Sequence, residues 1–503
     1  MSWKSDFFFL LLCVSVPVAS CQKDKTTRNF SDKKNDVRIF KRLCGLELAE
    51  PYNVSFRLVD DEITTTVQGC TGSFILGNRA STKPKKCSIK ISGPCVSEQN
   101  IFSRYGIKDA DRFKKKSLGE HLVSISYHVP GRSYGVISIE PAVEIHSDPY
   151  SFSQDSLKFD LSHIAILRKK NHIPLLRSLA PDGLIKIVNH ADTSRRFKFI
   201  LENYSDALSS MEHVNVITFS SKKKGKLSYL LEGTLPAKQS ALIKILPRKI
   251  YRPWSFAFGG DVKDEIGIFL QLLEQLLLTH SPLFIIEAGD YTRNSLPREL
   301  HNYFERTKWL PIPVYFVKGN HEIRVQGEKH YSRMFGPSRY SFSFDDVLFV
   351  ILDSTDYGTN GSETGFRLGN DQLSWLETVL KSNRSVKYSF VSLHTPPVPL
   401  HGPSLRPSYP SNMISSEATS LMDLSKKYSV TYVLSGHAHL YARKEINGTV
   451  YLTSGAGGAK LHTYNKVDGF DLDTKKHLMV FEITNSGIRE ERVFLPRDKL
   501  QSE

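Results

Sequence analysis

The feature that most constrains the fold of this chain is a series of short apolar segments in its second half, each followed by a few polar residues. Residues 255–258 are apolar, residues 265–278 carry apolar side chains at helical spacing, and residues 283–288 are apolar again. This order predicts a strand, a helix and a second strand. Alternating strands and helices indicate an α/β architecture, in which functional groups gather where strands end.

The same pattern continues towards the C-terminus. A helix is predicted at residues 371–380, between two of the apolar segments. Further buried strands are predicted at residues 314–317, 347–352, 388–393 and 431–434.

Polar groups follow these predicted strands in a repeated chemical pattern. Aspartate, asparagine and histidine together offer the mixed oxygen and nitrogen ligands that suit Mn, Fe, Zn or Co. Two carboxylates and three histidines are enough to hold two divalent cations. Any one of these groups alone is usually a turn or a structural histidine, so the predicted metal site depends on the ordered series. The series is Gly260-Asp261, Gly289-Asp290, Gly319-Asn320-His321-Glu322, His394 and Gly436-His437-Ala438-His439.

This series resembles the calcineurin-like metallophosphoesterase superfamily, including relatives of the purple acid phosphatases, over about residues 254–496. The resemblance implies a four-layer α/β (α+β) sandwich of two stacked β-sheets flanked by helices, with the metals at one sheet edge. A catalytic domain is therefore expected at residues 251–496. Other stretches that fit the family begin at Tyr340, Phe349, Gln372 and Thr453.

The resemblance also implies a reaction and a set of ligands. Family members hydrolyse phosphate mono- or diesters by attack of a metal-bridging hydroxide. His321 would not be a ligand but would steady the phosphoryl group or protonate the leaving oxygen. The implied ligands are Asp261 and His439 for the first metal ion, Asn320, His394 and His437 for the second, and Asp290 as the bridge.

Two positions depart from the family pattern. The first motif usually reads Asp-x-His, but residue 263 is a lysine, which cannot ligate a metal while protonated. We therefore expect weaker binding of the first ion unless Asp264 contributes, and Lys263 is either a contact for substrate phosphate or a surface side chain. Arg293 stands where purple acid phosphatases place a tyrosine, which predicts a site without the purple Fe(III) chromophore. Arg293 is a candidate phosphate clamp, with a surface arginine as the alternative.

The start of the chain has the pattern of an export signal. An apolar stretch at residues 7–20 is too short to span a bilayer and predicts a signal peptide at residues 1–20. The sequence Val18-Ala19-Ser20-Cys21 resembles a bacterial lipobox, which predicts an exported lipoprotein held at the membrane through lipidated Cys21. Ordinary cleavage after Ser20, giving a secreted protein, is the alternative. The polar residues 21–36 predict a tether.

Two β-rich domains are expected before the α/β half. Residues 37–130 contain four cysteines, Cys44, Cys70, Cys87 and Cys95, which predict two disulfides of open pairing in an oxidising compartment. Residues 131–250 predict a second β-rich domain, with an immunoglobulin-like sandwich as one candidate. Strand-like runs in these domains include 54–59, 72–76, 184–188, 197–201, 214–219 and 240–246.

The net charge of +15 is unevenly placed along the chain. Residues 251–503 hold 28 basic and 28 acidic side chains, so the whole excess lies in residues 1–250. The balanced α/β half needs no acidic partner beyond a phosphoester substrate, which argues against nucleic acid as a partner. The basic excess beside the predicted lipid anchor predicts attraction to an anionic membrane surface.

Two classes of function are compatible with this sequence. The first is an exported, metal-dependent phosphoric ester hydrolase with a binuclear metal site. The second is a non-catalytic surface or binding protein that keeps a degenerate phosphoesterase scaffold, which the lysine at position 263 favours.

The lipidation hypothesis predicts that fatty acid is attached to Cys21. In a bacterial host fed radiolabelled palmitate, the wild-type chain should carry label and a Cys21→Ser variant should not, because serine offers no thiol for lipid attachment. Cys44→Ser is the matched control and should keep the label. Intact-mass measurement of the mature N-terminus checks the same modification, and an unmodified wild-type N-terminus would rule it out.

Overall fold

The computed structural model describes residues 149–495, except 171, 264, 325–326, 361–362, 401–412 and 463–468, together with residue 121 and ten strands between Phe40 and Ile139. The predicted signal peptide, the tether and the side chains of the four cysteines lie outside this described part. The chain divides into two compact units, Met1–Pro141 and Ala142–Glu503. Among the described residues, no helix combines the length and apolar character needed to cross a bilayer.

The described strands of the first unit form two five-stranded sheets. In the second of them, Ile89, Ile91, Val123 and Ile125 are buried, while the residues between them are partly exposed. This period of two is typical of a strand with one face in a core. The first sheet has the order β1 (Phe40–Leu43), β2 (Leu46–Tyr52), β5 (Gly72–Asn78), β10 (Ser133–Ile139) and β7 (Ile101–Arg104). The second has the order β3 (Val54–Val59), β4 (Glu62–Val67), β6 (Lys85–Ser92), β9 (Leu122–Val129) and β8 (Phe113–Gly119).

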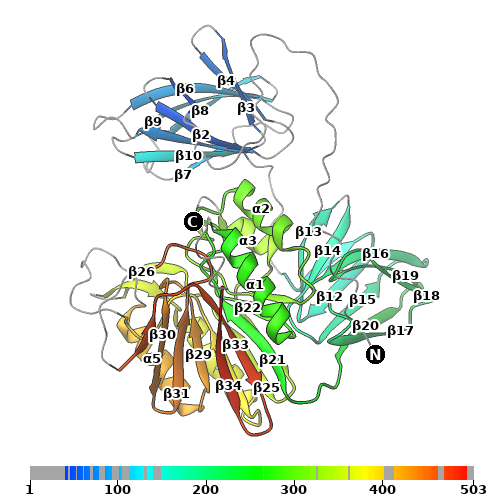
Figure 1. Cartoon of the computed structure of the whole chain (residues 1–503). Coiled ribbons are helices and arrows are strands. Elements are labelled where there is room, and N and C mark those ends of the chain that lie inside the picture. Colours follow the sequence, from blue (N-terminus) through cyan, green and yellow to red (C-terminus); the bar gives the residue numbers. More distant parts are fainter. Residues whose placement is uncertain are drawn as a thin grey trace. The chain divides into compact units, whose positions relative to one another are not determined.

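The second unit opens with a further pair of five-stranded sheets (Figure 1). Apolar side chains from both sheets, such as Phe159, Ile187, Phe199 and Leu231, pack into one buried cluster. One sheet has the order β11 (Ser151–Gln154), β12 (Leu157–Ser162), β15 (Gly183–Asn189), β20 (Ser240–Pro247) and β17 (Ser209–Val214). The other has the order β13 (Ile164–Lys170), β14 (Ile173–Ser178), β16 (Arg195–Glu202), β19 (Ser228–Leu235) and β18 (Thr218–Lys223). We call this part the β-sandwich.

The prediction of one strand in the β-sandwich is wrong. The apolar run at residues 214–219 is not a single strand, because β17 ends at Val214 and β18 begins at Thr218. Asn215 between them has a left-handed backbone (φ 61°), and the two strands pair in different sheets. The run is therefore the corner where the chain crosses from one sheet to the other, and Ile217 is 62% exposed there.

The α/β half contains two mixed sheets. In the first, β21, β22 and β23 are parallel to one another and β33 runs antiparallel beside β21. The strands predicted at residues 255–258, 283–288 and 314–317 correspond to β21, β22 and β23 to within two residues. The order of this first sheet is β23 (Val314–Phe316), β22 (Ile285–Glu287), β21 (Trp254–Gly259), β33 (His477–Ile483) and β34 (Ile488–Phe494).

The second mixed sheet has seven strands, of which β25, β28, β29 and β31 are parallel neighbours. A separate hairpin is formed by β26 (Asp356–Asn360) and β27 (Glu363–Arg367). The order of the seven strands is β24 (Tyr340–Phe344), β25 (Val347–Ile351), β28 (Tyr388–Ser392), β29 (Tyr432–Ser435), β31 (Thr449–Ser454), β30 (Tyr441–Ile446) and β32 (Asp471–Asp473).

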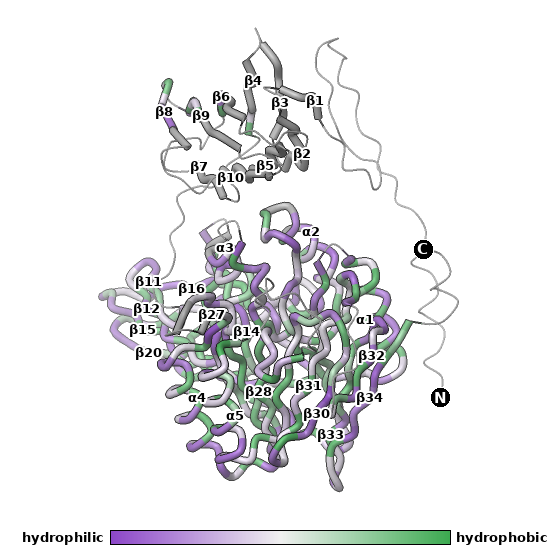
Figure 2. Tube along the Cα trace, turned by 90° about the vertical axis from the view of Figure 1, so that its left-hand side faces the viewer, coloured by the Kyte–Doolittle hydropathy of each residue, from purple (hydrophilic) through white to green (hydrophobic). Residues whose placement is uncertain are grey.

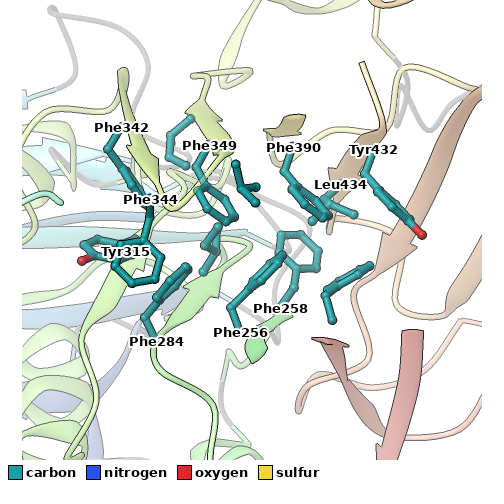
Figure 3. Packing of buried hydrophobic residues seen from close by; sticks show 14 of the residues in the cluster. Phe256, Phe258, Phe284, Tyr315, Phe342, Phe344, Phe349, Phe390, Tyr432 and Leu434 are labelled. Carbon is teal, nitrogen blue, oxygen red and sulfur yellow. The ribbon is translucent and has the colours of Figure 1, made fainter. Parts of the chain in front are cut away.

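Aromatic side chains fill the space between these two sheets (Figure 3). Phe256 of β21 meets Phe390 of β28 edge to face, with ring centroids 4.9 Å apart, and Phe284 meets Phe349 in the same way at 5.3 Å. Edge-to-face contacts of this kind add about 0.5–1.5 kcal/mol per pair beyond the burial of the rings. The contacts fix the two sheets against each other, so that the loops at their strand ends hold constant positions.

Among the residues that the structure describes, five helices lie on the outer faces of the sheets. Residues of α1, α2 and α3 pack with the first sheet, and residues of α4 and α5 pack with the second. Both faces of the second sheet are apolar because each is covered. In strand β25, Phe349 points into the aromatic core between the sheets, and Val350 points into the apolar cluster under α4 and α5. In Figure 2, strands such as β28 and β31 contain strongly hydrophobic positions beside weakly polar ones. The helices are α1 (Ile266–His280), α2 (Pro297–Thr307), α3 (Gly327–Met334), α4 (Asn370–Ser382) and α5 (Ser415–Lys427).

The β-sandwich is joined to β23 by buried side-chain hydrogen bonds. The Asn203 amide accepts the Val314 N–H at 2.9 Å and donates to the Val314 carbonyl at 3.1 Å and to the Ser178 carbonyl at 3.0 Å. Arg177 donates to the same Val314 carbonyl at 2.8 Å. Each bond satisfies a polar group that burial has removed from water.

We predict that Asn203→Ala destabilises the protein by about 2–4 kcal/mol more than Asn215→Ala, because it leaves buried backbone groups without partners. The two asparagines form a matched pair, since both have left-handed backbones (φ 60° and 61°) and only Asn203 is buried. Urea unfolding of both variants measures the difference. Equal losses would show that the amide bonds at Val314 add nothing to stability.

Candidate active site

The loops that follow β21, β22, β23, β28 and β29 bring their polar residues into one cluster. These loops come from both sheets, yet His394 Nε2 lies 3.3 Å from Asp290 Oδ1. The His437 N–H donates to Asp261 Oδ2 at 2.8 Å, which links a further pair of loops. All six ligands predicted from the sequence lie in this cluster, and Asp261, Asp290 and His394 are fully buried.

Several residues of the cluster have left-handed backbones. Asp261, Asp290, Lys263 and His437 have φ values of 61°, 58°, 49° and 68°. Such conformations cost an ordinary residue roughly 1–3 kcal/mol and persist only where the surroundings enforce them. Here the loops hold one another, since the N–H groups of Val262 and Lys263 both donate to the Asp290 carbonyl at 3.0 Å.

Two glycines of the predicted motifs are required for space. A Cβ atom at Gly319 would lie 2.3 Å from the Asp290 nitrogen, and one at Gly436 would lie 2.7 Å from Asp261 Oδ2. Both distances are far below normal van der Waals contact. The absence of a side chain at these glycines therefore allows neighbouring loops to touch.

A buried carboxylate, Glu322, holds two of these loops together. It accepts hydrogen bonds from the N–H groups of Asp290 at 2.7 Å, Tyr291 at 3.0 Å and Gly319 at 3.0 Å. The first two donors follow β22 and the third follows β23. Burial and the nearby charge of Asp290 raise the pKa of Glu322 to about 8, whereas these hydrogen bonds favour the ionised form.

Four ligand atoms converge around His394. His394 Nδ1 lies 2.7 Å from the Ala288 carbonyl, which can only accept, so Nδ1 carries a hydrogen and Nε2 is the ring atom left to bind a metal ion. His394 Nε2 lies 3.1 Å from Asn320 Oδ1 and 3.3 Å from Asp290 Oδ1. His437 Nδ1 lies 3.0 Å from the same Asn320 oxygen. We call Asp290, Asn320, His394 and His437 the amide-side group.

A second set of ligand atoms lies around Asp261. One ligand atom each of Asp261, Asp290 and His439 lies within 4.8 Å of the others. Within the described part of the chain, Asp261 Oδ1 and Asp290 Oδ2 are buried without a hydrogen-bond partner. Lys263 enters this set, with its Nζ 2.8 Å from His439 Nε2 and 3.2 Å from Asp290 Oδ2. We call Asp261, Asp290 and His439 the lysine-side group.

The charges of the cluster are strongly coupled. Burial alone would raise the pKa of Asp290, but His321, His394 and Lys263 lower it well below its ordinary value. Burial would lower the pKa of His394, whereas Asp290 raises it to about 9. Burial and the neighbouring His394 hold the pKa of His437 well below its ordinary value. The surroundings of His394 Nε2 therefore stabilise a positive charge at this atom, whether it is a proton or a bound cation.

His321 and Arg293 are placed together, but not as a pair of side chains. The His321 Nδ1–H donates to the backbone carbonyl of Arg293, and His321 Nε2 lies 3.6 Å from Asp290 Oδ2. Burial lowers the pKa of His321 to about 3, so the ring is neutral at neutral pH. The Arg293 side chain is exposed, and its carbonyl sets the orientation of His321.

Some residues of the site were not singled out from the sequence. His462 stacks on His439 with ring centroids 4.0 Å apart, and its Nδ1 accepts the His439 N–H at 3.3 Å. Lys318, directly before Gly319, is buried and pairs with Asp353. Glu322 belongs to the motif recognised in the sequence, but the sequence did not show that its side chain is fully buried. Asp264, considered as an extra ligand, lies outside the described residues.

Comparisons with known proteins agree with this arrangement. The family described as calcineurin-like phosphoesterase matches residues 255–441. This part of the chain is a calcineurin-like phosphoesterase domain. The human serine/threonine-protein phosphatase CPPED1 is 28% identical over 231 residues, which are 42% of this chain and 72% of that protein. A 3′,5′-cyclic-nucleotide phosphodiesterase of Nostoc is 26% identical over 191 residues, or 37% of this chain and 67% of that protein.

The phosphoesterase domain is also related to the purple acid phosphatases. Purple acid phosphatase 13 of Arabidopsis thaliana is 30% identical over 182 residues, which are 31% of each protein. The solved structure of a purple acid phosphatase from yellow lupin seeds aligns with a TM-score of 0.43 and 10% identity, over 84% of this chain and 90% of that one. GAP50, the anchor in the inner membrane complex of Plasmodium, aligns with a TM-score of 0.39 and 18% identity. The alignment covers 48% of this chain and 85% of that one.

The family implies divalent metal ions, and the two groups of donors fit them differently. In the amide-side group, ligand atoms of Asn320, His394 and His437 face one another, which suits a shared cation. In the lysine-side group, the unpartnered carboxylate oxygens also suit a cation, but the Lys263 ammonium already lies against Asp290 and His439. The amide-side group therefore fits a metal ion, and the lysine-side group contains a cation of its own.

We predict that Glu322→Gln weakens metal binding by about 10–100-fold and lowers the free energy of unfolding by about 1–3 kcal/mol, because the new amide turns a donor towards backbone N–H groups. Isothermal titration with Mn²⁺ and urea unfolding measure the two effects. Glu445→Gln, at an exposed position of β30, is the matched control and should change neither. Wild-type affinity in Glu322→Gln would contradict the positioning role.

Proposed function

We propose that this phosphoesterase domain hydrolyses phosphate mono- or diesters with a divalent cation bound by the amide-side group. The observation that carries the proposal is the convergence of ligand atoms of Asn320, His394 and His437 beside the buried carboxylate of Asp290. Family membership of residues 255–441 supports the same reaction class.

A cation bound there would supply Lewis-acid polarisation of a phosphoryl oxygen and of an attacking water molecule. The residues of this chain contribute fixed positions. The Ala288 carbonyl holds the His394 ring, and Glu322 holds the loops of Asp290 and Asn320. Because these contacts exist before substrate arrives, little reorganisation accompanies the reaction.

We propose that His321 contacts the phosphoryl group. Its Nδ1–H is engaged by the Arg293 carbonyl, so the neutral ring presents Nε2 as an acceptor beside Asp290. Because phosphoryl oxygens only accept hydrogen bonds, donation to them by His321, like protonation of the leaving oxygen, would require Nε2 to take up a proton first. Arg293, whose side chain is exposed and whose carbonyl contacts His321, is the proposed phosphate clamp.

The similar proteins span both kinds of ester. Their names include a serine/threonine-protein phosphatase, a purple acid phosphatase and a cyclic-nucleotide phosphodiesterase. The proposal therefore covers monoesters and diesters, and assays need to include both.

One observation favours a second candidate, a non-catalytic binding protein on a phosphoesterase scaffold. Lys263 fills part of the lysine-side group, where the family pattern has a metal-binding histidine. Purified protein that binds neither Mn²⁺, Zn²⁺ nor Fe²⁺ and turns over neither class of ester would favour this candidate. Turnover that a chelator abolishes and added metal restores would exclude it.

We predict that Asp290→Asn lowers hydrolysis of a chromogenic phosphomonoester and of its bis-ester by at least about 100-fold, because a buried anionic ligand is lost. Steady-state kinetics in the presence of Mn²⁺ measures the change. Asp423→Asn, at an exposed position of α5, is the matched control and should keep the wild-type rate. Near-normal rates in Asp290→Asn would refute the assignment.

A further inference from the structure

We propose that the ammonium group of Lys263 takes the place of one of the two metal ions implied by the family, so that this centre binds a single divalent cation. The inference rests on the proposed function, since it concerns the same cluster, but it makes a separate statement about metal content. It also gives Lys263 a role within the cluster, in place of the substrate contact or surface position that its sequence context suggested.

The first argument is the hydrogen-bonding state of His439. Its Nδ1 lies 2.6 Å from the Lys460 carbonyl, which can only accept, so Nδ1 carries the hydrogen. The lone pair is therefore on Nε2, the atom that a metal ion in the lysine-side group would need. Lys263 Nζ lies 2.8 Å from that atom and donates to it.

The second argument is the position of the ammonium between charged groups. Lys263 Nζ is also 3.2 Å from Asp290 Oδ2, an oxygen that otherwise has no hydrogen-bond partner among the described residues. His439 Nε2 in turn lies 3.4 Å from the buried Asp261 Oδ1. A divalent ion at this point would have to lie against the lysine charge, which opposes its binding.

The third argument is that the lysine is held in place. Its backbone N–H donates to the Asp290 carbonyl at 3.0 Å, and its left-handed backbone (φ 49°) is fixed by the neighbouring loop. Its side chain is only 16% exposed. A side chain anchored in this way directs its charge into the cluster, unlike a surface lysine in solvent.

The two groups of donors consequently have different occupants. The amide-side group keeps its converging ligand atoms for a metal ion, whereas the lysine-side group is completed by the ammonium. Asp290 lies between them, with Oδ1 facing His394 and Oδ2 facing Lys263. The carboxylate would then bridge one metal ion and one ammonium group.

The test is the metal content of the full-length protein. After chelation, reloading with excess Mn²⁺ and gel filtration, the wild type should retain about one Mn²⁺ per chain by elemental analysis. Its electron paramagnetic resonance spectrum should be that of isolated Mn²⁺. Lys263→His, which restores the family ligand, should retain about two ions and give the spectrum of a spin-coupled pair. Lys308→His, at an exposed position after α2, is the matched control and should behave as the wild type.

Two ions and a spin-coupled spectrum in the wild type would overturn the inference, whatever the variants do, so it stays falsifiable if Lys263→His fails to fold. A single ion in folded Lys263→His would also count against it. Hydrolysis with two ions bound would contradict this inference alone. A single bound ion without hydrolysis would contradict the proposed function and leave the inference standing.

Discussion

The arrangement of the site depends on one buried carboxylate. Glu322 accepts N–H groups from the loops after β22 and β23, and these loops carry Asp290 and Asn320. Burying a charge next to another carboxylate is unfavourable, which is why the pKa of Glu322 rises to about 8. The hydrogen bonds offset part of that cost, and a positive charge beside Asp290 would offset more. The loops are therefore stable in the geometry that also suits a cation.

The aromatic core makes this local arrangement possible. Loops with left-handed residues such as Asp261 and Asp290 store strain, and they need a rigid base. The base is the contact between two sheets, where Phe256 and Phe284 meet Phe390 and Phe349 edge to face. Parallel strands from the two sheets end at the same place, so residues more than a hundred positions apart come within hydrogen-bonding distance. The histidines of the second sheet thus complete a site begun by the aspartates of the first.

Much of this could be read from the sequence, because strands buried on both faces are continuous apolar runs and their ends carry the functional groups. The positions of β21, β22, β23, β25, β28 and β29 followed from that rule. The rule failed at residues 214–219, where an apolar run is an exposed corner between sheets. It also could not show that Glu322 ties loops together, that the Arg293 carbonyl orients His321, or that Lys263 contacts His439. These are contacts between residues distant in sequence, and local pattern carries no information about them.

The amide of Asn203 has a consequence for the sheet that carries the site. Strand β23 is the outermost strand of its sheet, and an outermost strand offers unpaired backbone groups to any other chain. Asn203 matches the N–H and the carbonyl of Val314 with one side chain, as a neighbouring strand would do with its backbone. The β-sandwich therefore occupies backbone groups of this edge that could otherwise pair with a second chain. A shorter chain that keeps the metal cluster would also have to keep residues 149–250 or supply new cover for this edge.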